Sequence, residues 1–390
     1  MVIKSYRTAS LFILCLLLTM CAQKAEDKYR VEVKEGIEYV HNSAEPLYPS
    51  KSIRFVEELS IFPEDEDGQI LIYRPGSYAV DEDGQIYICD LQDQKIKVFD
   101  FSGRYVRSIG DKGEGPGEFK NLIRVALLPD GRLITMDWEM KRISLFTRDG
   151  QFLTSHKYRN WGYNIYLTTS TLYAREEVIF GPQTQRFVKA SDFEGQELFS
   201  YGQFEYNHSQ EVNEGGRRFS FSRPFDRYSI LAGDRKNGRL YHCLNDKYLI
   251  EVFDHEGQLF RKIDRPYDLV PVTESDVERY LDGFRVRGIS DKDLALIEKN
   301  MEMPKLKTVT DRMIVDDQGN LWIETNETRT MEDGTSTAAF DIFNEDGIYV
   351  SKIWTPLSIG LFHKGKMYHL ETDKETGFRI LKRYGLIWSD

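Results

Sequence analysis

Short runs of alternating apolar and polar residues, separated by glycine turns, recur along most of the chain. The clearest copy spans Tyr78–Phe119, where runs such as Ile86–Ile88 and Tyr105–Ile109 are rich in β-branched and aromatic residues. Such runs favour strands, and the intervening Gly84 and Gly103 supply the positive φ that tight hairpin turns need. Four short antiparallel strands in about 40 residues predict one blade of a β-propeller.

Two columns of turn residues indicate that this unit recurs six times. The first column is Gly84, Gly131, Ser170, Gly238, Gly319 and Gly365, and the second is glycine at positions 103, 150, 195, 257, 347 and 385. Three residues after the first column stand the aromatic residues Tyr87, Tyr173, Tyr241, Trp322 and Tyr368, with Ile134 in the remaining copy. Two independent columns predict an all-β, six-bladed β-propeller in which these aromatic residues pack between blades.

The spacing of the first column locates two insertions. Its steps are 47, 39, 68, 81 and 46 residues, whereas an ordinary blade needs about 40–45. The long steps place one insertion at about 204–227, between blades three and four, and another at about 268–307, between blades four and five. The second insertion holds two candidate helices, which begin near Thr273 and Ser290, each three residues before an aspartate as in a capping box. We expect these helices to lie together as a lid on one face of the ring.

Ring closure requires a partner strand for the last blade, because the sixth repeat nearly reaches the end of the chain. The isolated strand pattern at Ile53–Phe62 has no hairpin partner of its own and is the favoured closing strand. The tail Leu386–Ser389 is the competing candidate. The predicted propeller domain is therefore 53–390, preceded by a polar, turn-rich tether and approach segment at 22–52.

The N-terminus resembles a secretory signal. Lys4 and Arg7 precede an apolar run, Ala9–Met20, that is too short to span a bilayer comfortably. The run ends in Leu-Thr-Met-Cys at 18–21, which resembles a bacterial lipobox in which Cys21 is lipidated. The prediction is a lipoprotein signal peptide at 1–21 and a lipid anchor as the protein's contact with the membrane; ordinary cleavage, or no cleavage, is the alternative.

Charge and cysteine content limit the classes of partner and the kinds of cross-link that this protein can have. The 52 basic and 63 acidic residues give a net charge of −11, which argues against nucleic acid or an anionic bilayer as a general partner. Outside the signal, Cys89 and Cys243 fall at equivalent places in blades one and four, on opposite sides of the ring. A disulfide needs Cα atoms within about 7 Å, so no disulfide is expected. No paired histidines stand at metal-ligand spacing, and no metal or cofactor is predicted.

One resemblance supports the fold. The segment "IGDKGEGPGEF" at Ile109–Phe119, followed by "LIRVALLPDGRLITMD", resembles the NHL-type repeat, and especially the six-bladed propeller lipoproteins of Bacteroidetes-type bacteria. "NGRLYHCLNDKYLIEVFDHEGQLFRKI" and "VDDQGNLWIET" extend the resemblance to blades four and five, whereas blades three and six are degenerate. The resemblance implies a protein of the cell envelope, at the periplasmic or outer-membrane surface. Such repeats serve as binding scaffolds in most settings and as enzymes in some.

An arginine-rich stretch in the first insertion is the candidate ligand-binding site. The residues are Arg217, Arg218, Phe219, Phe221, Arg223 and Arg227, with Phe225 among them. Arginine forks bind carboxylate, sulfate or phosphate groups, and aromatic rings stack on sugars or peptides. The alternative interpretation is a loop anchored by its phenylalanines, with arginines paired to local acids.

The mouth of the central channel is the rival location, because propeller enzymes such as calcium lactonases place Glu, Asn and Asp there. The inner strands expected here lie near Tyr78–Val80, Val125–Leu127, Asn164–Tyr166, Tyr228–Ile230, Met313–Val315 and Ser358–Gly360. They are mostly apolar or hydroxylated, so no catalytic residue is predicted. His242 and His369 share one column and are expected to be packing residues with satisfied rings. The sequence favours a non-enzymatic envelope scaffold that recognises a protein, peptide or glycan; the alternative is a lactonase-like hydrolase or lyase.

Overall fold

The computed structural model describes residues 28–389, apart from 65–70, 182–183, 208, 215–216, 287–288 and 374–375. The predicted signal at 1–21, with Cys21, lies outside the described residues. No helix in the described ranges is long and apolar enough to cross a membrane.

Six four-stranded antiparallel blades form the ring, with helices inserted between blades four and five, so the predicted fold class is confirmed. Blade one is β4 (Pro75–Val80), β5 (Ile86–Asp90), β6 (Lys95–Phe99) and β7 (Tyr105–Ile109), and blade two is β10 (Leu122–Leu127), β11 (Leu133–Asp137), β12 (Arg142–Phe146) and β13 (Phe152–Lys157). Blade three is β14 (Ile165–Thr168), β15 (Tyr173–Ile179), β16 (Gln185–Ser191) and β17 (Glu197–Phe204), and blade four is β20 (Ser229–Asp234), β21 (Arg239–Leu244), β22 (Leu249–Phe253) and β23 (Leu259–Asp264). Blade five is β24 (Thr310–Val315), β25 (Leu321–Thr330), β26 (Ser336–Phe343) and β27 (Tyr349–Thr355), and blade six is β28 (Leu361–His363), β29 (Lys366–Thr372), β30 (Arg379–Ser389) and β3 (Ser52–Ile61). A short parallel pair, β8 (Asp111–Lys112) and β9 (Glu118–Phe119), follows blade one.

The N-terminal strand β3 closes the ring as the outermost strand of blade six. It pairs antiparallel with β30, from Ser52 opposite Ser389 to Ile61 opposite Leu381. The competing candidate, Leu386–Ser389, is the second half of β30 and pairs with β3 rather than replacing it. Strand β3 and the C-terminal strand β30 are therefore held together in one sheet, as the sequence predicted.

The segment predicted to be a tether contains a β-hairpin instead. Strands β1 (Tyr29–Lys34) and β2 (Ile37–Asn42) pair with each other, and β2 adds in parallel to β23, extending blade four to six strands. Glu35 and Gly36 join them with φ of 51° and 81°, as a type I′ turn requires. A hairpin at the edge of a sheet needs only one buried face. The fully buried Val40 provides that face, although the segment is otherwise polar.

The aromatic column packs in the core, as predicted. Tyr87, Tyr173, Tyr241, Trp322 and Tyr368 are all at most 2% exposed. Two of the polar ends are satisfied by turn aspartates: the Tyr87 hydroxyl donates to Asp81 Oδ2 at 3.0 Å, and Trp322 Nε1 donates to Asp316 Oδ2 at 2.9 Å. Cys89 and Cys243 are buried and unpaired within the described residues.

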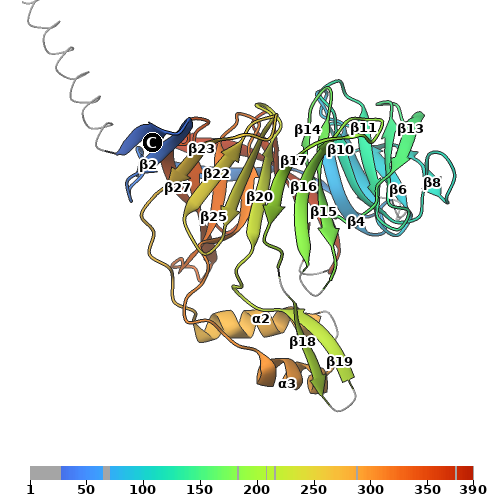
Figure 1. Cartoon of the computed structure of the whole chain (residues 1–390). Helices are drawn as coiled ribbons and strands as arrows, with labels where there is room; N and C mark the ends of the chain where they lie inside the picture. The colour runs from blue at the N-terminus through green and yellow to red at the C-terminus, as the bar shows by residue number, and fades with distance from the viewer. Residues whose placement is uncertain are drawn as a thin grey trace, which may run out of the picture.

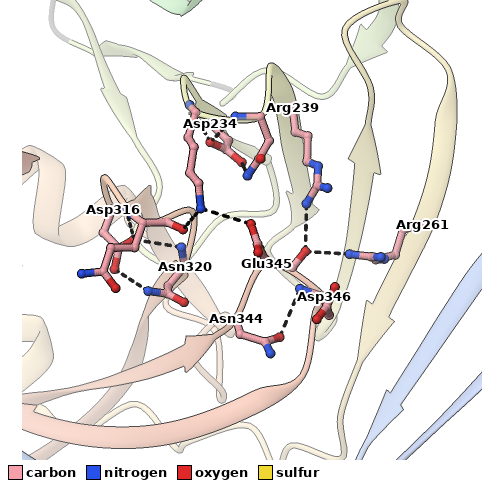
Figure 2. Close-up of polar contacts among 11 residues, drawn as sticks. Asp234, Arg239, Arg261, Asp316, Asn320, Asn344, Glu345 and Asp346 are labelled. Carbon is pink, nitrogen blue, oxygen red and sulfur yellow. Dashed lines mark hydrogen bonds and ion pairs between the residues drawn. The ribbon is translucent and has the colours of Figure 1, made fainter.

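Polar turns join neighbouring blades on the face that carries the glycine columns (Figure 2). Between blades four and five, Arg239 and Arg261 both donate to the backbone carbonyl of Glu345, at 2.8 and 2.7 Å. Lys236 donates to the carbonyl of Gln318 at 2.8 Å. Arg239, Arg261 and Lys236 of blade four thus bind the turns of blade five, and these contacts hold the two blades together.

Candidate functional site

The two insertions fold together into a small unit, which we call the insertion subdomain. It consists of the hairpin β18 (Ser209–Glu214) and β19 (Arg217–Ser222) with the helices α2 (Glu274–Val286) and α3 (Asp291–Asn300). Its core is formed by Val212, Phe221, Leu281, Phe284, Leu294 and Ile297. Figure 1 shows the unit projecting beyond one end of the blades. We call that side of the ring the insertion face.

A buried ion pair secures the start of α2. Lys307 Nζ lies 2.7 Å from Asp276 Oδ1, and both side chains are at most 5% exposed. The Thr273 hydroxyl also donates to Asp276 at 2.7 Å, and the Asp276 amide donates to that hydroxyl at 3.3 Å. These bonds confirm the predicted capping box at the start of this helix. Burial alone would raise the pKa of Asp276, but the hydrogen bonds from Lys307 and Thr273 outweigh it and lower the pKa. At α3, Ser290 caps the helix by accepting from the Asp293 amide.

The structure places the predicted arginine-rich site on and after β19. The ring of Phe221 is 4% exposed and packs edge-to-face on Phe284, inside the subdomain. Arg227 forms ion pairs with Glu205 at 2.9 Å and Asp246 at 3.1 Å, and Arg223 lies 3.9 Å from Glu302. Arg217, Arg218 and Phe219 belong to β19, but their side chains lie outside the described set. Ligand binding by these six residues stays a prediction.

A second location emerges at the centre of the ring, where a cavity of about 450 Å³ opens between blades. It is lined by Gly76, Ser77, Tyr78, Leu91, Ile123, Arg124, Tyr163, Arg312, His369, Leu370 and Arg379. Arg124 and Arg312 lie on β10 and β24, the innermost strands of blades two and five. Both stand near the starts of their strands, and the insertion subdomain connects directly to the start of β24. The cavity therefore lies at the insertion face, and we call it the channel-mouth cavity.

The two inner-strand arginines occupy equivalent positions in opposite blades. Arg124 pairs with Met136 and Arg312 with Glu324, and in each strand the register shifts immediately before the arginine. Such a β-bulge redirects a side chain relative to the regular pleat. Blades two and five face each other across a ring of six, so both guanidinium groups reach the cavity from opposite sides.

The three arginines differ in how fully the protein satisfies them. Arg124 donates through Nε to the Tyr163 carbonyl at 2.7 Å and through Nη2 to Asn164 Oδ1. Arg379 donates to the Pro75 carbonyl at 3.1 Å. The guanidinium of Arg312 has no hydrogen-bond acceptor among the described residues, and its nearest carboxylate oxygen is Glu324 Oε2 at 3.9 Å. Most of the N–H donors of this cluster remain available to a ligand.

His369 and Tyr78, which also line the cavity, are uncharged near neutral pH. Burial, with repulsion from Arg312 and Arg379, lowers the pKa of His369 to about 4. Burial raises the pKa of Tyr78 to about 12, and its hydroxyl donates to the Tyr368 carbonyl at 2.8 Å. None of the described lining residues is a carboxylate. The channel-mouth cavity is therefore cationic, although the chain as a whole is acidic.

The sequence did not predict this cluster, because the expected inner strands of blades two and five each began one residue after the arginine. The inner strands were expected at Val125–Leu127 and Met313–Val315, but they begin earlier and include Arg124 and Arg312. The sequence signal that could have revealed the cluster is an arginine at the same position of two otherwise apolar inner strands. Of the two column histidines, His242 is satisfied as expected, by Glu251 at 3.0 Å and Ser229 at 2.9 Å. His369 differs, because its ring lines the cavity.

Comparisons with known proteins support the fold. A family model described as a 6-bladed beta-propeller (DUF5128) matches residues 72–217. No curated protein matches the chain. Similar solved structures include a candidate exported protein of Bacteroides fragilis, with 10% identity, a TM-score of 0.49 and coverage of 90% of this chain and 100% of that one. A DUF4221-family member of Bacteroides vulgatus has 12% identity, a TM-score of 0.47 and coverage of 87% and 99%.

A gluconolactonase of Xanthomonas campestris is a further match, with 13% identity, a TM-score of 0.42 and coverage of 84% of this chain and 89% of that one. Matches at these identities and TM-scores carry no argument about activity or export. Among the described residues, no group of three or more His, Cys, Asp or Glu side chains could hold a metal ion. The order of the strands and the description of the family model agree on a six-bladed β-propeller.

Proposed function

We propose that this chain is a non-enzymatic binding propeller of the cell envelope, which recognises a protein, peptide or glycan on its insertion face. The observation that carries the proposal is the grouping of two recognition features on one side of the ring. The insertion subdomain and the cationic channel-mouth cavity both lie at this face. On the opposite face, Arg239 and Arg261 of blade four donate to the backbone carbonyl of Glu345 in blade five (Figure 2).

The chemistry of the cavity suits binding better than bond cleavage. Three arginines supply fixed positive charge and directional N–H donors, which recognise anionic groups without changing them. Hydrolysis commonly needs a paired acid and base or an activated nucleophile. The described lining residues supply one uncharged imidazole, His369, and no carboxylate.

The placement in the envelope rests on the predicted signal at 1–21 and lipidation of Cys21. Strand β1 begins at Tyr29, so an anchor at Cys21 would leave only residues 22–28 as a tether. Seven extended residues reach at most about 25 Å. A lipid anchor would therefore hold the outer edge of blade four, where β1 and β2 are added, close to the membrane surface.

Affinity recovery tests the proposal. The intact lipoprotein, immobilised in detergent, is expected to retain one protein, peptide or glycan from solubilised envelope and to release it chemically unchanged, as mass spectrometry would show. A variant without lipidation, Cys21→Ser, controls for capture through the lipid. Metal-dependent turnover of lactones or esters by the purified chain would overturn the proposal.

The alternative function is a hydrolase or lyase with a lactonase-like site at the channel mouth. The observation in its favour is His369, an uncharged ring beside Arg312 and Arg379 in one cavity. A neutral imidazole can accept a proton, and neighbouring arginines can stabilise a developing oxyanion. In that case His369→Gln would abolish turnover while ligand binding persisted.

A further inference from the structure

We propose that the channel-mouth cavity is an oxyanion-binding site for a sugar-sized ligand that carries one carboxylate or phosphate group. This inference rests on the proposed function, because it names the ligand class recognised at the insertion face. It assigns the binding role to Arg124, Arg312 and Arg379, which stand 188 and 67 positions apart in the chain.

Charge balance is the first argument. Several arginines outside the cavity pair with acids: Arg227 with Glu205 and Asp246, and Arg285 on α2 with Glu278 at 2.7 Å and with Asp282. At the channel mouth three arginines line one cavity, none of its described lining residues is a carboxylate, and the acid beside them is Glu324, whose Oε2 lies 3.9 Å from Arg312. Like charges in a partly enclosed space repel one another more strongly than in bulk water. An anion in the cavity relieves that repulsion.

Geometry is the second argument. Arg124 and Arg312 approach from opposite blades at equivalent bulged positions. The hydrogen bonds to the Tyr163 carbonyl and Asn164 hold the Arg124 guanidinium in place, so little side-chain freedom is lost when it binds. Arg312 has no such bond among the described residues, and its N–H groups are available to the ligand. This arrangement suits an oxygen-bearing group between the two guanidinium planes.

The rest of the lining sets the ligand's size and character. A volume of about 450 Å³ falls within the range of small-molecule sites, about 300–1,000 Å³. Leu91, Ile123 and Leu370 provide apolar walls, and the exposed ring of Tyr163 offers a surface on which a sugar can stack. The neutral ring of His369 can donate to or accept from a ligand hydroxyl. These features fit a hydroxylated ring with one anionic substituent.

Calorimetric titration of the mature chain with D-glucuronate, glucose 6-phosphate and glucose tests the site. At least one anionic probe is expected to bind about tenfold or more tightly than glucose, since hydrogen bonds to charged groups are individually strong. The better of the two anions identifies a carboxylate or a phosphate as the preferred group. Affinity for that anion is expected to fall as salt is raised.

Arg312→Ala is the sharpest variant, because this guanidinium makes no hydrogen bond within the described chain that its removal would break. We expect about 10-fold to 100-fold weaker binding of the anionic probe, with glucose unaffected. Arg312→Lys, which keeps the charge but not the fork, is expected to fall between. Arg104→Ala, at an exposed arginine that pairs with Asp100 in the turn between β6 and β7, is the matched control and should bind as the wild type. Thermal unfolding of each variant verifies that it is folded.

Equal affinity for all three probes, or a folded Arg312→Ala variant that binds the anion as the wild type does, would overturn the site. Undiminished capture of an envelope ligand by Arg312→Ala would also overturn it, and would leave the proposed function standing. Turnover of a lactone or ester by a chain that also shows arginine-dependent anion binding would overturn the proposed function and support the site.

Discussion

At the residue scale, the half-buried ring of His369 makes part of the protein's stability depend on pH. His369 has its pKa lowered to about 4 by burial and by Arg312 and Arg379, while Glu371 acts in the opposite direction. The folded state therefore favours the neutral ring. Its contribution to stability is complete above the ordinary histidine pKa of about 6.5 and is lost as the pH falls toward 4.

We predict that His369→Gln makes the protein less sensitive to mild acid. Between pH 7 and pH 5 the wild type should lose roughly 1–2 kcal/mol more unfolding free energy than the variant, after allowance for the partial exposure of the ring. His156 and His363, whose pKa values burial also lowers, remain in both proteins. Denaturant unfolding at a series of pH values measures the difference, and parallel stability curves would contradict the prediction.

The residue scale also shows where sequence reasoning reaches its limit. The cluster at 217–227 was visible because its arginines are neighbours in the chain, yet the structure pairs Arg227 with acids and buries Phe221. The cluster of Arg124, Arg312 and Arg379 forms only when three blades meet at the channel. Spacing along one chain cannot show that meeting unless the register of each inner strand is known to the residue.

At the element scale, the insertion subdomain behaves as a module with its own small core. Phe221 of β19 packs between the hairpin and α2, and Leu294 and Ile297 of α3 complete the cluster. The capping patterns at Thr273 and Ser290 were sufficient to predict both helices. Their union with a hairpin from the other insertion could not be predicted, because no repeat pattern links the two segments.

Phe221→Ala should loosen this module without unfolding the ring. Removing a buried phenylalanine ring costs about 3–5 kcal/mol, which is large for a core of this size. We expect faster amide hydrogen exchange across 204–227 and 268–307, with exchange in the blades unchanged. Phe221→Leu, which keeps most of the buried volume, serves as the control. Faster exchange throughout the propeller would show that the module and ring unfold as one unit.

The hairpin of β1 and β2 illustrates a second element-scale limit. Its alternation and its Glu35-Gly36 turn are hairpin signals, but polar composition favoured a tether. The pairing of β2 with β23, which the sequence does not reveal, is what makes this segment a hairpin rather than a tether.

At the scale of the whole molecule, the repeat columns predicted the ring and its closure, since a propeller without a closing partner exposes a strand edge.

Two N-terminal truncations distinguish the contribution of the β1–β2 hairpin to stability from that of β3. A chain that starts at residue 45 loses β1 and β2, which extend blade four and bond to blade five through Asn42, and should melt no more than about 10 °C lower than the longer chain. A chain that starts at residue 64 loses β3 and leaves β30 unpaired on its outer side. We expect this shorter chain not to unfold cooperatively, and equal melting curves for the two truncations would contradict ring closure by β3.

The central functional claim is that the channel mouth on the insertion face holds an anionic group. A crystal structure of the chain grown with D-glucuronate or glucose 6-phosphate tests it most directly. The account predicts ligand density in the channel-mouth cavity, with an oxyanion oxygen within hydrogen-bond distance of Arg312 and of Arg124 or Arg379. An empty cavity at saturating ligand, or a ligand bound with its anionic group turned away from these arginines, would contradict it.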